Sequence, residues 1–291
     1  MLSYAYNTNG CQNHRLTEAI DLIARHGYRG VALTLDWLHL DPFAPDWEQR
    51  TRAVRRQLRD AGLRSVVETG ARFLLRPAQK HEPTLLNPHA NGRQQRLDFL
   101  KRAVDIAQIL DSETVSFLAG VKQSSVNDAE AWSYLMEGVG ALLAYAEERR
   151  VTLSMEPEPG HHLETNADWE RLRAQLPNGD ALRLALDVGH VWVTGEMDPA
   201  ESVLQYQDHL GTVAIEGMNR GVHVHLPLHE GDMELAPILE NLGRIGFERL
   251  ICVELSRESH RAHLAIPESI AQLRRLEASV TGATNEQSLN I

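Results

Sequence analysis

The chain has 291 residues, with 29 Lys and Arg against 40 Asp and Glu, so its formal net charge is −11. Hydrophobic residues make up 43% of the chain, an ordinary globular composition that excludes a disordered or fibrous protein. An acidic chain is poorly suited to hold nucleic-acid phosphates, and no stretch approaches the ~18–20 apolar residues that cross a bilayer. Two cysteines, Cys11 and Cys252, make no disulfide framework, so we expect a cytoplasmic protein without nucleic-acid or membrane partners.

Short apolar runs alternate with longer amphipathic runs, and this alternation predicts the fold. Eight runs are strand-like: Leu2–Tyr6, Gly30–Leu35, Arg64–Glu68, Glu113–Leu118, Val151–Glu156, Leu182–Asp187, Thr212–Glu216 and Leu250–Glu254. Between them, apolar residues recur at helical spacing in stripes that begin at Leu16, Leu97 and Leu135. Eight strand–helix units predict an α/β fold, a closed (β/α)8 TIM barrel. The alternative, an open doubly wound sheet, lacks a GxGxxG turn after the first strand.

We expect one barrel domain over residues 1–278 and a polar C-terminal tail over 279–291, because the last residues are polar and without periodicity. Asn166, Asp198 and Pro267 occupy positions typical of helix caps or first turns.

Histidines gather in the segments that follow strands. Twelve of the 14 do so: His14, His39, His81, His89, His161, His162, His190, His223, His225, His229, His260 and His263. In a barrel these segments form the C-terminal face, where active sites lie.

Carboxylates end five of the eight strand-like runs: Glu68, Glu156, Asp187, Glu216 and Glu254. Because side chains alternate along a strand, one terminal acid per strand can point into the barrel mouth. Several converging acids repel one another unless a cation neutralises them. This pattern therefore favours a divalent metal site over isolated surface acids.

Two short motifs add imidazole ligands to these acids. LDVGH places Asp187 and His190 three residues apart beyond a strand, with Gly189 permitting a turn, and GVHVH places His223 and His225 on one side of an extended segment. Imidazole together with carboxylate is typical of zinc or manganese. We therefore expect Mn²⁺ or Zn²⁺ as cofactor, with Mg²⁺ or Co²⁺ as alternatives.

At these motifs the chain resembles the xylose-isomerase-like barrel superfamily, which holds sugar isomerases and epimerases and the endonuclease IV type of DNA-repair enzyme. The resemblance extends from Leu2 to about Leu276 and is most specific in LSMEPEPG, LALDVGHVW and HVHLPLHEGDMELAPILENLGRIGFERLICVEL. It implies a metal held by Glu156, Asp187, position 214 and Glu254. Position 214 is Ala where the epimerases have His.

The endonuclease branch implies a different set of ligands. His190, His223 and His225 resemble its second group of zinc ligands, with His223 in place of an acid. The histidines that end its second and third strands are missing, since the third strand here ends in Glu68. The metal can thus be held by Glu156, Asp187 and Glu254 or by the three histidines, with Glu216 or Glu68 as a substitute ligand.

We predict a metal-dependent isomerase or epimerase of a small sugar-like or polyol compound, in which Glu156 and Glu254 move a proton beside a carbonyl. Two alternatives stay open: a metal-dependent hydrolase of a phosphodiester or ester, and a non-catalytic accessory barrel of a biosynthetic cluster.

Basic residues follow the third and eighth strand-like runs, which favours an anionic group on the small-molecule substrate. The candidate substrate-binding residues are Glu68, Arg72, Lys80, His81, Glu216, Arg257 and His260. The sequence leaves the oligomeric state open, with a homodimer as one option.

Overall fold

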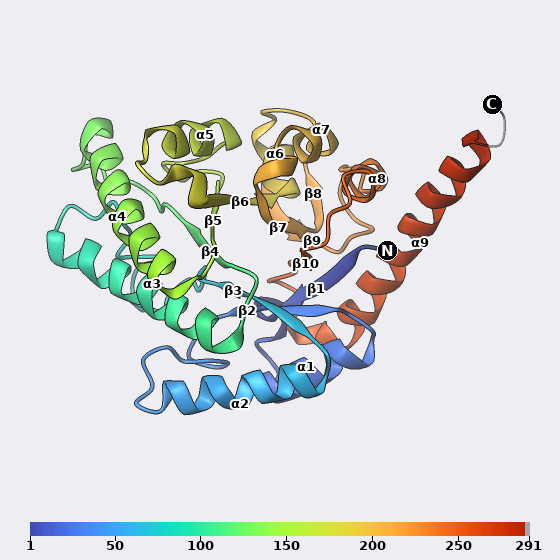
Figure 1. The fold of residues 1–291 in the computed structure, drawn as a ribbon, viewed down its shortest axis with the longest axis horizontal. Helices are drawn as coiled ribbons and strands as arrows, with labels where there is room; N and C mark the ends of the chain where they lie inside the picture. The colour runs from blue at the N-terminus through green and yellow to red at the C-terminus, as the bar shows by residue number, and fades with distance from the viewer. Residues whose placement is uncertain (289–291) are drawn as a thin grey trace.

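The computed structural model describes residues 1–288, with side chains to residue 280, and its centre is a closed barrel of eight parallel strands (Figure 1). Around the barrel the order is β1, β10, β7, β6, β5, β4, β3 and β2. The barrel strands are β1 Ser3–Asn7, β2 Gly30–Thr34, β3 Arg64–Glu68, β4 Val115–Leu118, β5 Leu153–Glu156, β6 Leu182–Asp187, β7 Leu210–Ile215 and β10 Leu250–Val253. The predicted (β/α)8 barrel is confirmed, and each strand lies within the expected run or within two residues of it.

Helices surround this barrel and cover its outer face (Figure 1). The α-helices are α1 Leu16–Arg25, α2 Trp47–Asp60, α3 Ala90–Leu110, α4 Asp128–Arg149, α5 Asn166–Gln175, α6 Val188–Thr194, α7 Pro199–Gln205, α8 Ala236–Arg244 and α9 Ala262–Ser288. Short 3-10 turns are η1 Thr8–Cys11, η2 Gly179–Ala181, η3 Gln207–His209 and η4 Ser259–Arg261. No helix in the described part of the chain is both long enough and apolar enough to span a membrane.

The apolar stripes explain why the helices lie where they do. On α1, Leu16, Ala19, Ile20 and Ile23 are all buried, and α4 buries its stripe from Leu135 in the same way. Each buried Leu or Ile side chain contributes about 1.5–3 kcal/mol when it leaves water. Removing such a stripe would detach its helix from the barrel.

Alternation along the strands divides the barrel interior into two layers. The lower layer is apolar or small, and Ala5, Ala32, Val66, Leu250 and Cys252 form a cluster of their own within it. By the same alternation, the upper layer has one residue from each strand or from the position just after it: Asn7, Thr34, Glu68, Ser116, Glu156, Asp187, Ala214 and Glu254. We call this layer the mouth ring. Seven of its members are polar or charged, and Ala214 is the exception.

A two-stranded hairpin follows β7 and was not expected from the sequence. It pairs β8 Gly217–Asn219 with β9 Val222–Leu226, so the predicted extended segment around His223 and His225 is confirmed as β9. The chain reverses at Arg220 and Gly221, where Gly221 has a φ of +71° that glycine adopts without strain. Because β10 pairs directly with β7, the hairpin stands outside the barrel wall at its mouth.

The predicted caps give mixed results. Asp198 caps α7 by accepting from the backbone N–H groups of Ala200 and Glu201, and Asn166 begins α5. Pro267 was wrong as a first-turn residue, because it lies inside α9. The helix begins five residues earlier since burial of Ala262 and Ile266 outweighs the one backbone hydrogen bond that proline cannot make.

The predicted tail 279–291 falls partly on α9, whose helical backbone crosses residue 278 and ends at Ser288. The division of the chain at residue 278 stays a prediction. Residues 289–291 lie outside the described part.

Candidate active site

Three carboxylates of the mouth ring converge. Oxygen atoms of Glu156, Asp187 and Glu254, from β5, β6 and the end of β10, lie within 4.8 Å of one another. Like charges at that distance disfavour full ionisation, which a divalent cation among them would offset. Burial, followed by Glu158 and Glu254, accordingly raises the pKa of Glu156 well above its ordinary value.

Asp187 has a structural and an electrostatic partner in His190. Its Oδ1 accepts from the backbone N–H of His190 at 2.9 Å and so caps α6, while Oδ2 lies 3.4 Å from Nε2 of His190. Burial alone would raise the pKa of Asp187, but His190 and His225 hold it below its ordinary value. Burial lowers and Asp187 raises the pKa of His190, and the net direction is upward.

Glu216 is fully buried behind this group. Oxygens of Glu216 and Asp187 and a ring nitrogen of His225 lie within 4.8 Å of one another. Burial, with Asp187 and Glu254, raises the pKa of Glu216 well above its ordinary value. Gly189 provides the space, because a Cβ there would lie 1.9 Å from Oε1 of Glu216. The expectation that Gly189 permits a turn was wrong: Gly189 is inside α6, and its small size is what Glu216 requires.

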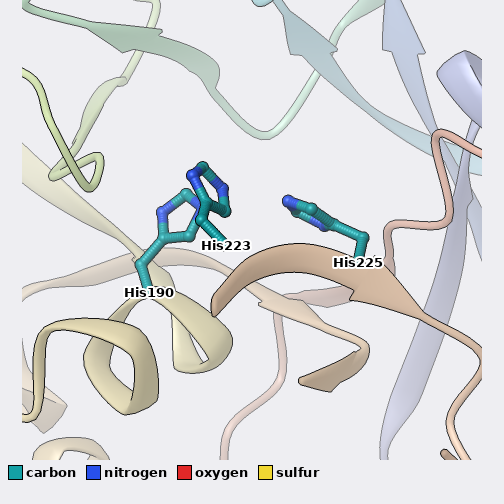
Figure 2. Close-up of side chains that lie close together, drawn as sticks. All are labelled: His190, His223 and His225. Atoms are coloured by element: carbon teal, nitrogen blue, oxygen red, sulfur yellow. The ribbon is translucent and has the colours of Figure 1, made fainter. Parts of the chain in front are cut away.

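Three histidines form a second group beside these acids (Figure 2). His190 comes from α6, and His223 and His225 come from β9, with ring centroids 4.7 Å (His190–His223), 5.8 Å (His190–His225) and 5.4 Å (His223–His225) apart. Burial, then His190 and His225, lowers the pKa of His223 to about 4. The cluster therefore offers at least one neutral imidazole at neutral pH.

Two of these rings are oriented by backbone carbonyls. Nδ1 of His190 donates to the carbonyl of Pro157 at 3.0 Å, and Nδ1 of His225 donates to the carbonyl of Glu254 at 3.2 Å. In that tautomer Nε2 has a free lone pair in each ring. Metal-binding histidines are usually held in this way.

Asp232 attaches the hairpin to α6. Its Oδ1 accepts from the indole N–H of Trp192 at 2.6 Å and from the backbone N–H of Arg220 at 2.9 Å. The guanidinium of Arg220 lies 4.7 Å from the Trp192 ring centroid. These contacts fix β9 relative to α6 and thereby bring the three histidines together.

Several buried polar atoms of the site have no hydrogen-bond partner within the described part of the protein. Among the described residues these include Oδ2 of Asp187, Nε2 of His190 and both carboxylate oxygens of Glu216. A buried polar atom without a hydrogen bond costs about 1–3 kcal/mol, or more when it is charged. Oxygen and imidazole donors in this arrangement fit a divalent cation such as Mn²⁺ or Zn²⁺.

A cavity of about 200 Å³ opens over the mouth ring. Predicted site residues in its wall are Glu68, Arg72, Lys80, His81, Glu156, His190, His223, His225, Arg257 and Glu254. Asp187 and Glu216 lie behind that wall, and His260 is exposed on η4 and does not line the cavity. Burial, followed by Glu254, raises the pKa of Glu68 to about 8, so this acid is a further protonatable group of the wall.

The basic residues after β3 have two different roles. Arg72 and Lys80 line the cavity, whereas Arg96 is buried and donates to the backbone carbonyls of His81 and Pro83. Arg96 therefore holds the loop in place.

Sequence reasoning missed two residues of the site. Glu158 lines the cavity. One oxygen of its carboxylate, one carboxylate oxygen of Glu156 and a ring nitrogen of His190 lie within 4.8 Å of one another. Asn9 donates to Oε1 of Glu254 at 2.8 Å. The repeated acid in EPEP was a signal for Glu158, since residues two apart in an extended segment share a side. No comparable signal marked Asn9.

A model of the xylose isomerase-like TIM barrel family matches residues 20–276. The chain belongs to this family. No curated protein sequence matches this xylose isomerase-like barrel, whereas many solved structures share its fold.

Three of these structures illustrate the range of the fold. A D-tagatose 3-epimerase-like protein is 16% identical, with a TM-score of 0.77 over 95% of this chain and 98% of its own. An IolI protein with a bound zinc atom is 17% identical, with a TM-score of 0.73 over 96% and 97%. A 3-keto-D-glucoside 4-epimerase from E. coli is 14% identical, with a TM-score of 0.71 over 94% and 98%. At sequence identities this low, the structural similarity establishes the barrel fold alone.

Proposed function

We propose that this protein is a metal-dependent isomerase or epimerase that moves a proton at a carbon next to a carbonyl in a sugar-like compound. The observation that carries the proposal is the convergence of Glu156, Asp187 and Glu254, of which Glu156 and Glu254 line the cavity and Asp187 lies directly behind its wall. The family, and two similar structures that are named as a sugar epimerase and an epimerase-like protein, support the same class of reaction.

The chain's own groups divide the work. Glu156 and Glu254 end strands three apart in the barrel, so they face the substrate from two sides. The ionised carboxylate removes a proton from one face of the carbon, and the other, in its protonated form, delivers its own proton to the opposite face. Asp187 joins them as a ligand, and a divalent cation there would stabilise negative charge on the carbonyl oxygen as the proton leaves. Asn9 fixes one oxygen of Glu254 and leaves Oε2 outside that hydrogen bond.

Further side chains would bind the substrate itself. Arg72, Lys80 and Arg257 in the cavity wall support an anionic group on the substrate, as a phosphate or a carboxylate. Glu158 and His190 lie beside the acids and offer hydrogen bonds to hydroxyl groups.

Proton exchange with solvent tests the proposal. Metal-loaded protein is incubated in D₂O with keto-sugars, inososes and sugar phosphates, and deuterium is located by NMR. A substrate should gain deuterium at one carbon, and Glu156→Gln should reduce that exchange by ~10²–10⁴. Exposed Glu170→Gln is the matched control and should exchange at the wild-type rate. Absence of exchange across the whole panel would contradict the proposal.

Metal-assisted hydrolysis is a second candidate, favoured by the three clustered histidines beside the acids. Two adjacent ligand groups are typical of sites that position a metal-activated water. Hydrolysis of bis(4-nitrophenyl) phosphate that is lost in His223→Ala would favour this candidate.

A further inference from the structure

A second cavity of about 300 Å³ opens beside the one over the mouth ring. It lies between the loops that follow β2 and β3, and its wall is largely apolar, with Trp37, Leu38, Phe73 and Leu74. We call it the apolar pocket. Nothing in the chemistry of proton transfer requires such a wall.

The apolar pocket is continuous with the first cavity. Asn9, Thr34, Gly70, Arg72 and Ser256 line both. At the junction, the Arg72 guanidinium donates to Oγ of Ser256 at 3.0 Å. Binding sites for small molecules usually measure ~300–1,000 Å³. The first cavity of about 200 Å³ falls below that range, and the two together fall within it.

Three apolar side chains of this pocket face solvent. Trp37 is 57% exposed, Leu38 65% and Phe73 50%, although neighbours such as Leu74 are buried. Among the described residues, four of the eight large apolar side chains that are exposed belong to these two loops, Phe43 being the fourth. Such a concentration at one edge of a polar cavity marks a binding surface.

The loops present these side chains in a fixed arrangement. Oδ1 of Asp36 accepts from the backbone N–H of Leu38 at 2.9 Å and of His39 at 2.7 Å. The ring centroids of Trp37 and Phe43 lie 6.3 Å apart, and those of Phe43 and the buried Phe99 lie 6.1 Å apart. A surface that is already ordered loses less conformational entropy when a ligand covers it.

We propose that the apolar pocket binds an uncharged aromatic or alkyl substituent of the same molecule whose sugar-like part lies over the mouth ring. For the sugar-like part of this molecule, the inference rests on the proposed function. The substrate is then a conjugate whose sugar-like part carries a carbonyl, rather than a free sugar. Asp36, in the pocket wall, can accept a hydrogen bond from a phenolic hydroxyl.

Matched ligands test the pocket without any turnover. Binding of methyl and phenyl β-D-glucosides, and of methyl and phenyl β-D-glucuronides, is measured by calorimetry on the full chain. The phenyl compound of at least one pair should bind about tenfold more tightly, the equivalent of burying some 55 Å² of apolar surface. Equal affinities within both pairs, or no binding of any compound, overturn the inference.

Variants assign the preference to the pocket. Trp37→Ala and Phe73→Ala should reduce the phenyl advantage to less than about threefold and leave the affinity for the methyl compound unchanged. Leu264→Ala, which changes an exposed apolar residue on α9, is the control and should keep the advantage. Equal weakening of both compounds in Trp37→Ala would overturn the assignment, because Trp37 would then contact the sugar.

Two further outcomes separate the competing explanations. A wild-type dimer that dissociates in Trp37→Ala while the phenyl preference persists would make this face an interface between two copies of the chain, and would overturn the inference. Preferential phenyl binding without deuterium exchange in any of the keto-sugars, inososes and sugar phosphates would support the pocket and contradict the proposed function. Deuterium exchange on free sugars without any phenyl preference would support the proposed function and overturn the inference about the pocket.

Discussion

The side-chain amide of Asn9 donates a hydrogen bond of 2.8 Å to Oε1 of Glu254. This contact joins the first strand–helix connection to the last barrel strand, across one of the two acids proposed to move the proton. The partners of Glu156 lie farther away: Oγ of Ser116 donates to its Oε2 at 3.4 Å, and Nδ1 of His190 lies 3.5 Å from its Oε1. The two acids therefore differ in environment, as a pair with separate roles in proton transfer should.

Asn9→Ala tests this difference. Loss of a hydrogen bond to a charged group costs about 1.5–3 kcal/mol, so the deuterium-exchange rate should fall roughly 10- to 100-fold. Metal content should stay at the wild-type value, because Asn9 lies outside the three converging acids. The exposed Asn13→Ala is the control. An unchanged exchange rate, or a loss of metal, would show that Asn9 has another role.

Removal of two acids tests the metal site. Protein purified without chelator should contain about one equivalent of a transition metal by elemental analysis. The double variant Asp187→Ala and Glu254→Ala should contain almost none, yet keep the wild-type far-UV circular dichroism, because both residues lie in the mouth and not in the packed layers. Wild-type protein with no transition metal would contradict the proposed cofactor.

The barrel was predictable because its signals are local. Each strand is a short apolar run, and stripes such as that from Leu135 recur at helical spacing, so period and alternation alone indicate eight units. Positions of Glu156, Asp187 and Glu254 followed from the same reasoning, since residues that end parallel strands must meet at one face.

The rest of the site depends on contacts between distant segments. The hairpin that carries His223 and His225 is held by Asp232 and Trp192, which lie 40 residues apart in the chain. The sequence shows that Ala214 stands where a ligand is expected. It does not show that Glu216 is buried against Gly189, because that contact requires the packing of α6 on β7. The basic residues after β3 were only partly informative, because Arg96 donates to a backbone carbonyl of its own loop and does not line the cavity.

His225 is expected to contribute to metal binding, because its Nδ1 is held by the carbonyl of Glu254 and leaves Nε2 free. His225→Ala should weaken the affinity for Zn²⁺ by roughly 10- to 100-fold in a competition titration with a chromophoric chelator. The exposed His229→Ala is the control. If metal affinity is unchanged and the Michaelis constant rises instead, His225 orients substrate.

His81 should make the stability of the metal-free protein depend on pH. It is buried in the loop after β3, and burial, followed by Lys80, Arg96 and Arg72, lowers its pKa to about 4. The unfolded chain has an ordinary histidine pKa of about 6.5, so it takes up a proton below that pH while the folded chain does not. This histidine thus contributes stability that is present above about pH 6.5 and is lost as the pH falls toward 4.

Urea unfolding at pH 7.5 and pH 5, with chelator at both, measures the effect. Wild type should lose about 2 kcal/mol more free energy of unfolding than His81→Asn between these pH values, because asparagine has no proton to take up. Asparagine also tolerates the φ of +61° that His81 adopts, so the loop should keep its conformation. The exposed His263→Asn should retain the full wild-type loss. Equal losses in wild type and His81→Asn would mean that His81 is protonated in the folded loop, with a carboxylate of the cavity as its partner.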